Sequence, residues 1–264
     1  MPKRTGKKFG EYETYPCCFC GRDYIKDNMM DMVNQVTYNK LTRDLFMKYE
    51  IDWDFVESSE VRASNANEDI NFKKVIDKVK KERTTIGGIF QVIAFNVPLG
   101  LGSHTHWDNK LDGKIAQSMV SINAVKGVEI GNGFENTERW GREVQDVIEP
   151  NSSDVRNFSQ ISNNSGGIEG GMSNGNDIIV NVAIKPIATM TSPLPSVDIM
   201  TGEVVEAAYN RSDICQVSRA CPVGEAMLAL TLTEAVLEKF GGDSLQEIKR
   251  NYTSYIKTFK EYGK

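Results

Sequence analysis

Helical periodicity is the first pattern that the chain shows. Apolar residues recur at helical spacing in four segments, 38–49, 71–81, 109–121 and 222–240. The last segment is apolar nearly all round between Ala226 and Leu232, which predicts a buried helix. Gly241 and Gly242 can end that helix in a left-handed turn. Ser244 and Glu247 then form a capping box, which predicts one more helix.

Strand patterns occur in two further segments. Residues 87–97 are rich in β-branched and aromatic side chains and end at Pro98, so they predict a strand. Residues 177–186 alternate, which predicts a second strand. Its apolar face consists of Ile178, Val180, Val182 and Ile184, and its other face of Asp177, Asn181 and Lys185.

The order of these elements predicts an α+β fold, because strands and helices do not alternate regularly. We expect one domain over residues 1–264, in which residues 1–37 show no clear periodicity and are divergent. Residues 136–165 are polar and aperiodic, so they predict a long loop. A loop of that length in a compact domain is more often functional than idle.

Composition narrows the class of protein. A net charge of −5 argues against a general binder of nucleic acid or of anionic membranes, but it leaves room for a local anion site. We find no apolar run of about eighteen residues, and the basic start is not followed by the apolar core of a secretory signal. We therefore expect a cytoplasmic protein with reduced cysteines and neither membrane nor nucleic acid as partner.

Metal chemistry has little support in the sequence. Cys17, Cys18 and Cys20 form "CCFC", which could be a metal knuckle, but the spacing of a four-ligand zinc site is missing. His104 and His106 lie two residues apart and could hold a metal or act as general acids. Neither histidine has a ligand partner at an obvious spacing, so loop packing is favoured and no metal site is expected.

A glycine-rich stretch, "NNSGGIEGGMSNG" at 163–175, leads directly into the second strand. It contains neither of the two common glycine-rich nucleotide motifs, so it predicts no phosphate cradle of those kinds. Flexible linkers are bordered by polar sequence, whereas this stretch runs into a patterned strand. A structured loop that faces a ligand is therefore favoured over a linker.

Three basic residues stand at the ends of predicted elements beside glycine or proline, namely Lys126, Lys185 and Arg211. Each could be an ordinary surface charge, or the three could share one anion site. Asp213 follows Arg211 by two residues. It could form a simple ion pair, or it could be a carboxylate that acts on a proton.

Four long motifs in a fixed order resemble those of the chorismate synthase family. They span about residues 85–240, with weaker similarity back to Tyr38. The motifs are "PLGLGSHTHWDNKLDGKIAQSMVSINAVKGVEIGNGF", "NNSGGIEGGMSNG", "VAIKPIATM" and "RSDICQVSRACPVGEAML".

The resemblance implies a reaction and a fold. Family members convert 5-enolpyruvylshikimate 3-phosphate to chorismate by anti-1,4-elimination of phosphate, in the shikimate pathway of aromatic amino acid biosynthesis. They need reduced FMN, which is thought to lend an electron transiently with no net oxidation. The family fold is a β-α-β sandwich with long helices between antiparallel sheets, and it is usually assembled as a homotetramer.

The resemblance also implies roles for individual residues. Asp213 matches an aspartate that is proposed to assist proton removal near the flavin. Arg211 matches an arginine that contacts flavin and substrate. The other matches are flavin contacts, at Asn123, Ala124, Gly170, Lys185, Pro186, Ile187, Ala188 and Thr189.

The chain departs from the family pattern at several places. The motifs that carry the two catalytic histidines of the family are absent, and "RSD" replaces the commoner "RHD". Arg142 stands where the family usually has a serine. We therefore expect an N-terminally truncated member of the family. Two interpretations stay open, an active chorismate synthase and a non-catalytic relative that retains part of a flavin or oligomerisation surface.

Overall fold

The computed structural model describes residues 52–209 and 213–261. The helix expected at 38–49, the "CCFC" motif and Arg211 lie outside these residues.

A three-stranded antiparallel sheet forms the centre of the molecule. Its strands are β1 (Gly88–Ala94), β7 (Ile178–Ile184) and β2 (Val125–Ile130), in the order β1-β7-β2. The strands expected at 87–97 and 177–186 are thereby confirmed. Because β7 pairs on both sides, all of its residues except Ala183 are buried.

Strand β2 is the strand of the central sheet that the sequence did not predict. We expected Lys126 to stand at the end of an element beside a glycine, whereas Val125–Ile130 pairs with β7 and contains a register shift between Val125 and Gly127. Glycine is unfavourable inside a strand, but it is common at such bulges. Gly127 therefore lies at the bulge, and it weakens the sequence pattern by which the strand could have been predicted.

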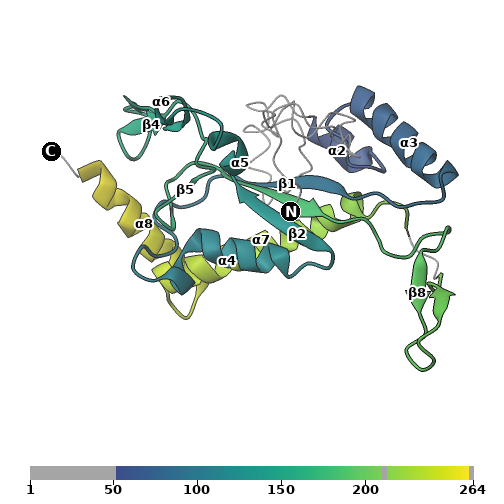
Figure 1. Ribbon diagram of the computed structural model, residues 1–264. Coiled ribbons are helices and arrows are strands. Elements are labelled where there is room, and N and C mark those ends of the chain that lie inside the picture. The colour runs from purple at the N-terminus through teal and green to yellow at the C-terminus, as the bar shows by residue number, and fades with distance from the viewer. Residues whose placement is uncertain (1–51, 210–212, 262–264) are drawn as a thin grey trace.

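Two helices cover one face of the sheet. Helix α4 (Leu111–Val120) and helix α7 (Val217–Phe240) lie side by side below it in Figure 1. Helix α4 confirms the one expected at 109–121. Its buried Leu111, Ile115 and Met119 join the apolar face of β7 in the main core. This face is therefore the largest buried apolar region of the described chain.

The other face of the sheet is covered by α2 (Trp53–Ser58) and α3 (Ala66–Lys81), which lie above β1 in Figure 1. Trp53 packs there against Ile93 and Ile179. Helix α3 was expected to begin at Asn71 but begins at Ala66, because the Asn65 side chain accepts a hydrogen bond from the Glu68 N–H at 3.0 Å and caps it.

A row of three polar side chains crosses the sheet on this face, where both strands beside β7 contribute one residue. Gln91 Nε2 donates to Asn181 Oδ1 at 2.8 Å, and Asn181 Nδ2 donates to Glu129 Oε2 at 2.9 Å. All three side chains are buried. Burial raises the pKa of Glu129, while hydrogen bonds from the Phe134 N–H and Asn181 oppose that rise.

Helix α7 differs from the expectation in two ways. It begins at Val217, so Pro222 lies inside it, near its start. The expectation of a helix buried all round is wrong, because Leu230 is 66% exposed on the side away from the sheet. By length and composition alone, α7 could cross a membrane. A helix that packs on a sheet passes the same test, and α7 packs against β1 and α4.

Short elements complete the described chain. The segment expected to be one long loop, 136–165, contains one short helix and a hairpin, namely α6 (Gly141–Val144), β3 (Ile148–Pro150) and β4 (Phe158–Gln160). Around it lie η5 (Trp107–Asn109), α5 (Gly133–Asn136), β5 (Ile168–Glu169) and β6 (Met172–Ser173). After β7 follow β8 (Pro195–Val197), β9 (Val204–Glu206) and α8 (Leu245–Glu261).

Gly224 tests how closely α7 packs on the sheet. A Cβ atom at this position would lie 2.5 Å from the ring of Phe90, which is fully buried. We expect Gly224→Val to lower the free energy of unfolding by about 1–3 kcal/mol through overpacking. The exposed neighbour Ala226→Val should change it by less than about 0.5 kcal/mol. Urea denaturation of both variants measures the difference, and equal effects would contradict the close contact.

Candidate functional site

The end of β7 carries the first part of the candidate site. Lys185 directly follows the strand, and its backbone N–H donates to the carbonyl of Ala124 at 2.9 Å. Ala124 has a φ of 67°, an unusual value for a residue with a side chain. The turn at Asn123 and Ala124 is thereby fastened to Lys185, and both Asn123 and Lys185 are exposed.

The segment after Lys185 is held by the residues that precede β1. A Cβ atom at Gly87 would lie 2.2 Å from the Ile184 carbonyl oxygen, so only glycine fits. Thr85 Oγ1 donates to the Ile187 carbonyl at 2.5 Å, and an Arg83 guanidinium nitrogen donates to the Thr191 carbonyl at 2.8 Å. Gly87 is not among the residues expected from the sequence, although the Gly-Gly pair of Gly87 and Gly88 was a signal for it.

A hollow of about 420 Å³ opens between the end of α4, the end of β7 and the start of α7. Asp213 lies in its wall, where its Oδ2 pairs with the Arg219 guanidinium at 2.7 Å. The residue after Asp213 accepts a backbone hydrogen bond from the Ile86 N–H at 2.9 Å, which fixes the approach to α7. The lining also includes Ser121, Ile122, Asn123, Ile184, Gln216, Ala220, Val223 and Met227.

Comparison with known proteins identifies the family. A family model described as chorismate synthase matches residues 21–237, which is most of the chain. The chain belongs to the chorismate synthase family. Chorismate synthase of Aquifex aeolicus is 49% identical over 206 residues, which are 78% of this chain and 51% of that protein. The Solibacter usitatus chorismate synthase is 48% identical over 198 residues, 75% of this chain and 51% of that protein.

A solved chorismate synthase structure agrees with the sequence comparisons. It matches with a TM-score of 0.67 and 42% identity, over 79% of this chain and 54% of that one. The expected α+β fold with helices and antiparallel sheets is confirmed. The chain spans about half the length of the curated relatives it matches.

The structure brings most of the residues implied by the chorismate synthase resemblance to one end of the sheet. Asn123 lies in the wall of the hollow with Asp213, and Ala124 is bonded to Lys185. Pro186, Ile187, Ala188 and Thr189 continue from Lys185 along the segment that Thr85 and Arg83 hold. Arg211 lies outside the described residues, and its role stays a prediction. Arg219, which no sequence motif indicated, pairs with Asp213.

Gly170 does not lie with this group. It sits in the turn between β5 and β6, next to Gly171, whose carbonyl accepts from the Leu111 N–H at the first residue of α4. Asn123 follows the opposite end of that ten-residue helix, about 15 Å away by helix length. Gly170 has a φ of 61°, and a Cβ atom there would meet open space. Its flavin contact stays a prediction.

Other glycines of the stretch 163–175 serve packing of the chain on itself. A Cβ atom at Gly166 would lie 2.2 Å from the Gly131 nitrogen, and one at Gly167 would lie 2.4 Å from the Asp177 carbonyl oxygen. Both glycines have positive φ and are buried. The stretch is therefore a structured loop, in agreement with the preference against a linker.

The remaining candidate residues lie elsewhere. His104 and His106 are exposed near the start of α4, where His106 Nδ1 contacts Asp108 Oδ1 at 2.5 Å. This contact lowers the pKa of Asp108. Cys215 and Cys221 are free thiols, and burial raises the pKa of Cys221 well above its usual range. In the described part of the chain, no group of three metal-ligating side chains comes together.

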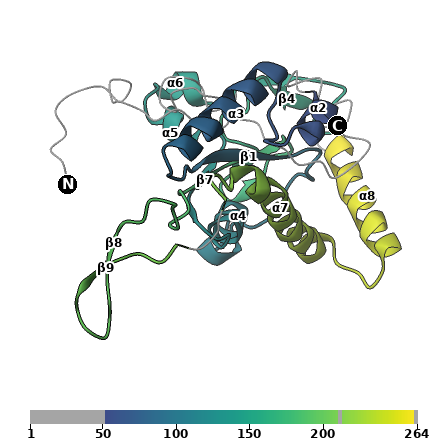
Figure 2. The same ribbon diagram turned by 90° about the vertical axis from the view of Figure 1, so that its right-hand side faces the viewer.

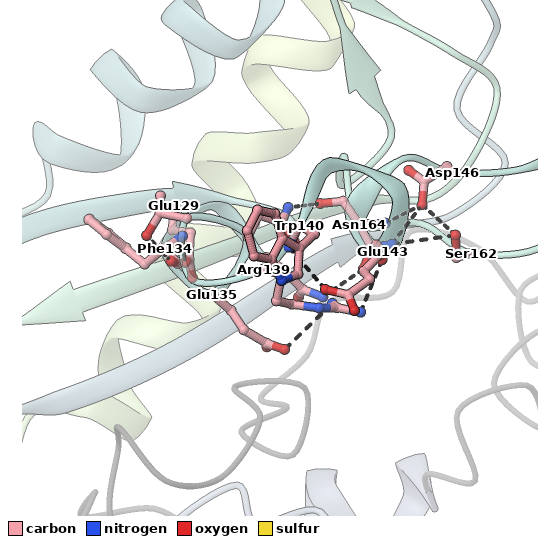
Figure 3. A network of polar contacts seen from close by, with 12 residues as sticks. Glu129, Phe134, Glu135, Arg139, Trp140, Glu143, Asp146, Ser162 and Asn164 are labelled. Carbon is pink, nitrogen blue, oxygen red and sulfur yellow. Dashed lines mark hydrogen bonds and ion pairs between the residues drawn. The ribbon is translucent and has the colours of Figure 1, made fainter. Parts of the chain in front are cut away.

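A dense polar network lies in the loops above the sheet (Figure 3). Asp146 is its centre, because its carboxylate accepts hydrogen bonds from Ser162 Oγ at 2.6 Å and from the backbone N–H groups of Asn164 and Ser165 at 2.8 and 3.0 Å. Arg139 pairs with Glu135 at 3.6 Å nearby. The polar groups of this network hydrogen-bond to one another. The network therefore fixes the chain around Asp146 to the chain around Asn164, and we do not assign it to ligand binding.

The Asp146 carboxylate should make stability depend on pH. Burial acts to raise its pKa, but the hydrogen bonds outweigh burial and lower the pKa below its ordinary value. Its contribution is therefore present above the unfolded pKa of about 4 and is lost as the pH falls through the lower folded pKa. We expect Asp146→Asn to destabilise the protein at pH 7 by about 1–3 kcal/mol and to lose that difference in acid.

Urea unfolding of wild type and Asp146→Asn from pH 3 to pH 7 checks this expectation. Asp77→Asn, an exposed carboxylate on α3, is the matched control and should show little difference at any pH. A constant difference between Asp146→Asn and wild type across the range would contradict the role of the charge.

Proposed function

We propose that this chain acts in the chorismate synthase reaction, the anti-1,4-elimination of phosphate from 5-enolpyruvylshikimate 3-phosphate to give chorismate with reduced FMN. The observation that supports the proposal best is the meeting of Asn123, Lys185 and Asp213 at one hollow and its rim. These residues come from three motifs that are far apart in the sequence. Three polar surface residues with unrelated roles would have no reason to meet at one place.

The residues present fit a flavin phosphate. The hollow lies within the volume range of small-molecule sites. An exposed ammonium at Lys185, an exposed amide at Asn123 and the Arg219 guanidinium are donors suited to an anionic ligand. In this proposal the turn at Asn123 and Ala124, the segment Lys185–Thr189 and Arg211 hold FMN, and Gly170 contributes from the β5–β6 turn. When bound, reduced FMN supplies an electron transiently without net oxidation.

The chain's own groups have two tasks in the reaction. Lys185 offers an exposed cation on a backbone that is held at a strand end, where it can balance phosphate charge as the substrate loses its phosphate. Asp213 assists removal of the proton that leaves with the phosphate, and the pairing with Arg219 holds its carboxylate at the wall of the hollow. The ion pair orients the carboxylate, because the guanidinium nitrogen is 2.7 Å from Oδ2.

The wider setting follows from the family. We infer a homotetramer that works in the cytoplasm as part of aromatic amino acid biosynthesis, with neither nucleic acid nor membrane as partner. The net charge of −5 argues against a surface that binds polyanions such as nucleic acid or anionic membranes. The non-catalytic alternative differs from this proposal only in turnover, so an activity assay separates the two.

Flavin affinity tests the proposed role of Lys185. We expect Lys185→Ala to weaken FMN binding about tenfold, because a charge-assisted contact to phosphate is lost. Lys257→Ala, an exposed lysine on α8, should leave the affinity unchanged. Titration of FMN fluorescence against protein gives the dissociation constant of oxidised FMN for each variant. The same titration after reduction under anaerobic conditions gives that of reduced FMN. Equal affinities for the two variants would remove Lys185 from the site.

Turnover tests Asp213. We expect Asp213→Asn to lower kcat for chorismate formation about 10²- to 10⁴-fold while FMN binding stays within about twofold of wild type. The assay follows chorismate with excess reduced FMN under anaerobic conditions, and Asp77→Asn is the control. Wild-type protein that binds FMN but forms no chorismate would overturn the proposed activity and support the non-catalytic alternative.

A further inference from the structure

The β8–β9 hairpin is an arm that stands away from the rest of the described molecule. We call residues 194–207 the arm. Figures 1 and 2 both show it extending beyond the sheet and helices. Its two strands pair only with each other, and its backbone bonds are internal, including the Ala207 N–H to the Leu194 carbonyl at 2.9 Å.

The arm exposes six apolar side chains, of which three lie on its two strands, two at its tip and one at its base. Ile199 is 95% exposed and Val204 is 76% exposed. The exposed apolar side chains of the arm are Leu194, Val197, Ile199, Met200, Val204 and Val205. A two-stranded hairpin alone is marginally stable in water, and clustered exposed apolar side chains mark contact surfaces. The arm therefore has the properties of a segment that is completed by another molecule.

The arm is also acidic. Between Pro186 and Asn210 the chain has no lysine or arginine, while Asp198, Glu203 and Glu206 lie within the arm. Its net charge is therefore −3. Asp198 accepts hydrogen bonds from the Met200 and Thr201 N–H groups and holds the tip, which leaves Glu203 and Glu206 as exposed charges. A partner surface for the arm should combine positive charge with apolar area.

Helix α3 offers such a surface on the same side of the molecule. Lys74, Lys78 and Lys81 recur at the i, i+4, i+7 spacing of one helix face, and all are exposed. Asp77 is exposed on the same face, so the three lysines and this carboxylate together carry a net charge of +2. Ile70, one turn earlier on that face, is 50% exposed. Arg83, just after α3, donates to the Thr191 carbonyl at the base of the arm, so the basic helix ends where the arm begins.

We propose that the arm docks on α3 of a second copy of this chain, and that α3 of the first copy receives the arm of the second. A two-fold axis requires one surface that carries both halves of the contact, and the arm and α3 adjoin on one side of the molecule. The arm is held away from its own α3 and is free to reach a neighbour's. The arm and α3 would form one interface of the homotetramer inferred under the proposed function. The contact itself does not depend on flavin or substrate.

Complementary charge reversals in the full 264-residue chain test the pairing. The arm variant is Glu203→Lys with Glu206→Lys, and the helix variant is Lys74→Glu with Lys81→Glu, which spares the Lys78–Glu82 pair. Each variant alone places like charges at both contacts, so we expect its dissociation constant to rise tenfold or more at low salt. An equimolar mixture of the two should associate again, because both contacts in the mixed pair are then opposite in sign.

Sedimentation equilibrium at several protein concentrations gives these constants, and circular dichroism verifies that each variant is folded. Lys249→Glu with Lys257→Glu on α8 is the charge-matched control and should assemble as wild type does. Leu230→Asp on the exposed side of α7 examines the rival apolar surface and should also leave assembly unchanged.

Recovery of association in the mixture, together with normal assembly of both controls, supports the arm and α3 as the interface. A monomeric wild type, a mixture that stays dissociated, or loss of assembly in Leu230→Asp with none in the arm variant would each overturn the proposal. Because none of these measurements includes flavin or substrate, their failure is distinguishable from failure of the proposed activity.

Discussion

The described structure depends on the pairing of β7 on both of its edges. One edge holds β1 and the other holds β2, so a single seven-residue strand that follows the long polar region pairs with two strands that both precede it. Its apolar face forms the core with α4 and α7, and its end delivers Lys185 to the turn at Ala124. The candidate site is therefore a direct product of where this strand stops.

Glycine has two separate tasks around this framework. At Gly87, Gly166 and Gly167 the absence of a side chain lets one stretch of backbone lie against another. At Gly170 the backbone is left-handed, as it is at Gly166 and Gly167, but no atom lies within 4 Å of where a side chain would be. Gly166 and Gly167 explain the shape of the loop 163–175, and Gly87 explains how closely the chain before β1 approaches the end of β7. Gly170 is the position at which a ligand could approach the backbone.

The sequence predicted what periodicity and turn chemistry control. Helix α4 and strands β1 and β7 have strong patterns, and they lie where the patterns placed them. The resemblance to chorismate synthases joined motifs that no local pattern could join, and the meeting of Asn123 and Asp213 follows that expectation. Strand β2 was missed because Gly127 weakens its pattern, and only pairing with β7 makes the segment a strand.

Other features lie beyond the reach of local reasoning. The exposure of Leu230 depends on which layers surround α7, and an apolar pattern says only that a side could be buried. The pairing of Arg219 with Asp213 spans a helix start and depends on the direction in which the chain enters α7. The extended arm is equally invisible in sequence, because its short strands have no partner beyond each other.

The buried row of Gln91, Asn181 and Glu129 has a consequence for how β7 finds its place. Alternation of apolar and polar positions rejects a shift of the strand by one residue, because every side chain would change face. It does not reject a shift by two, which keeps each residue on its face. In this protein such a shift would move Asn181 away from both of its neighbours and leave a buried carboxylate without its amide partner. The row thus disfavours the shift by two residues that the hydrophobic pattern alone would permit. It thereby sets Lys185 as the residue that follows the end of β7.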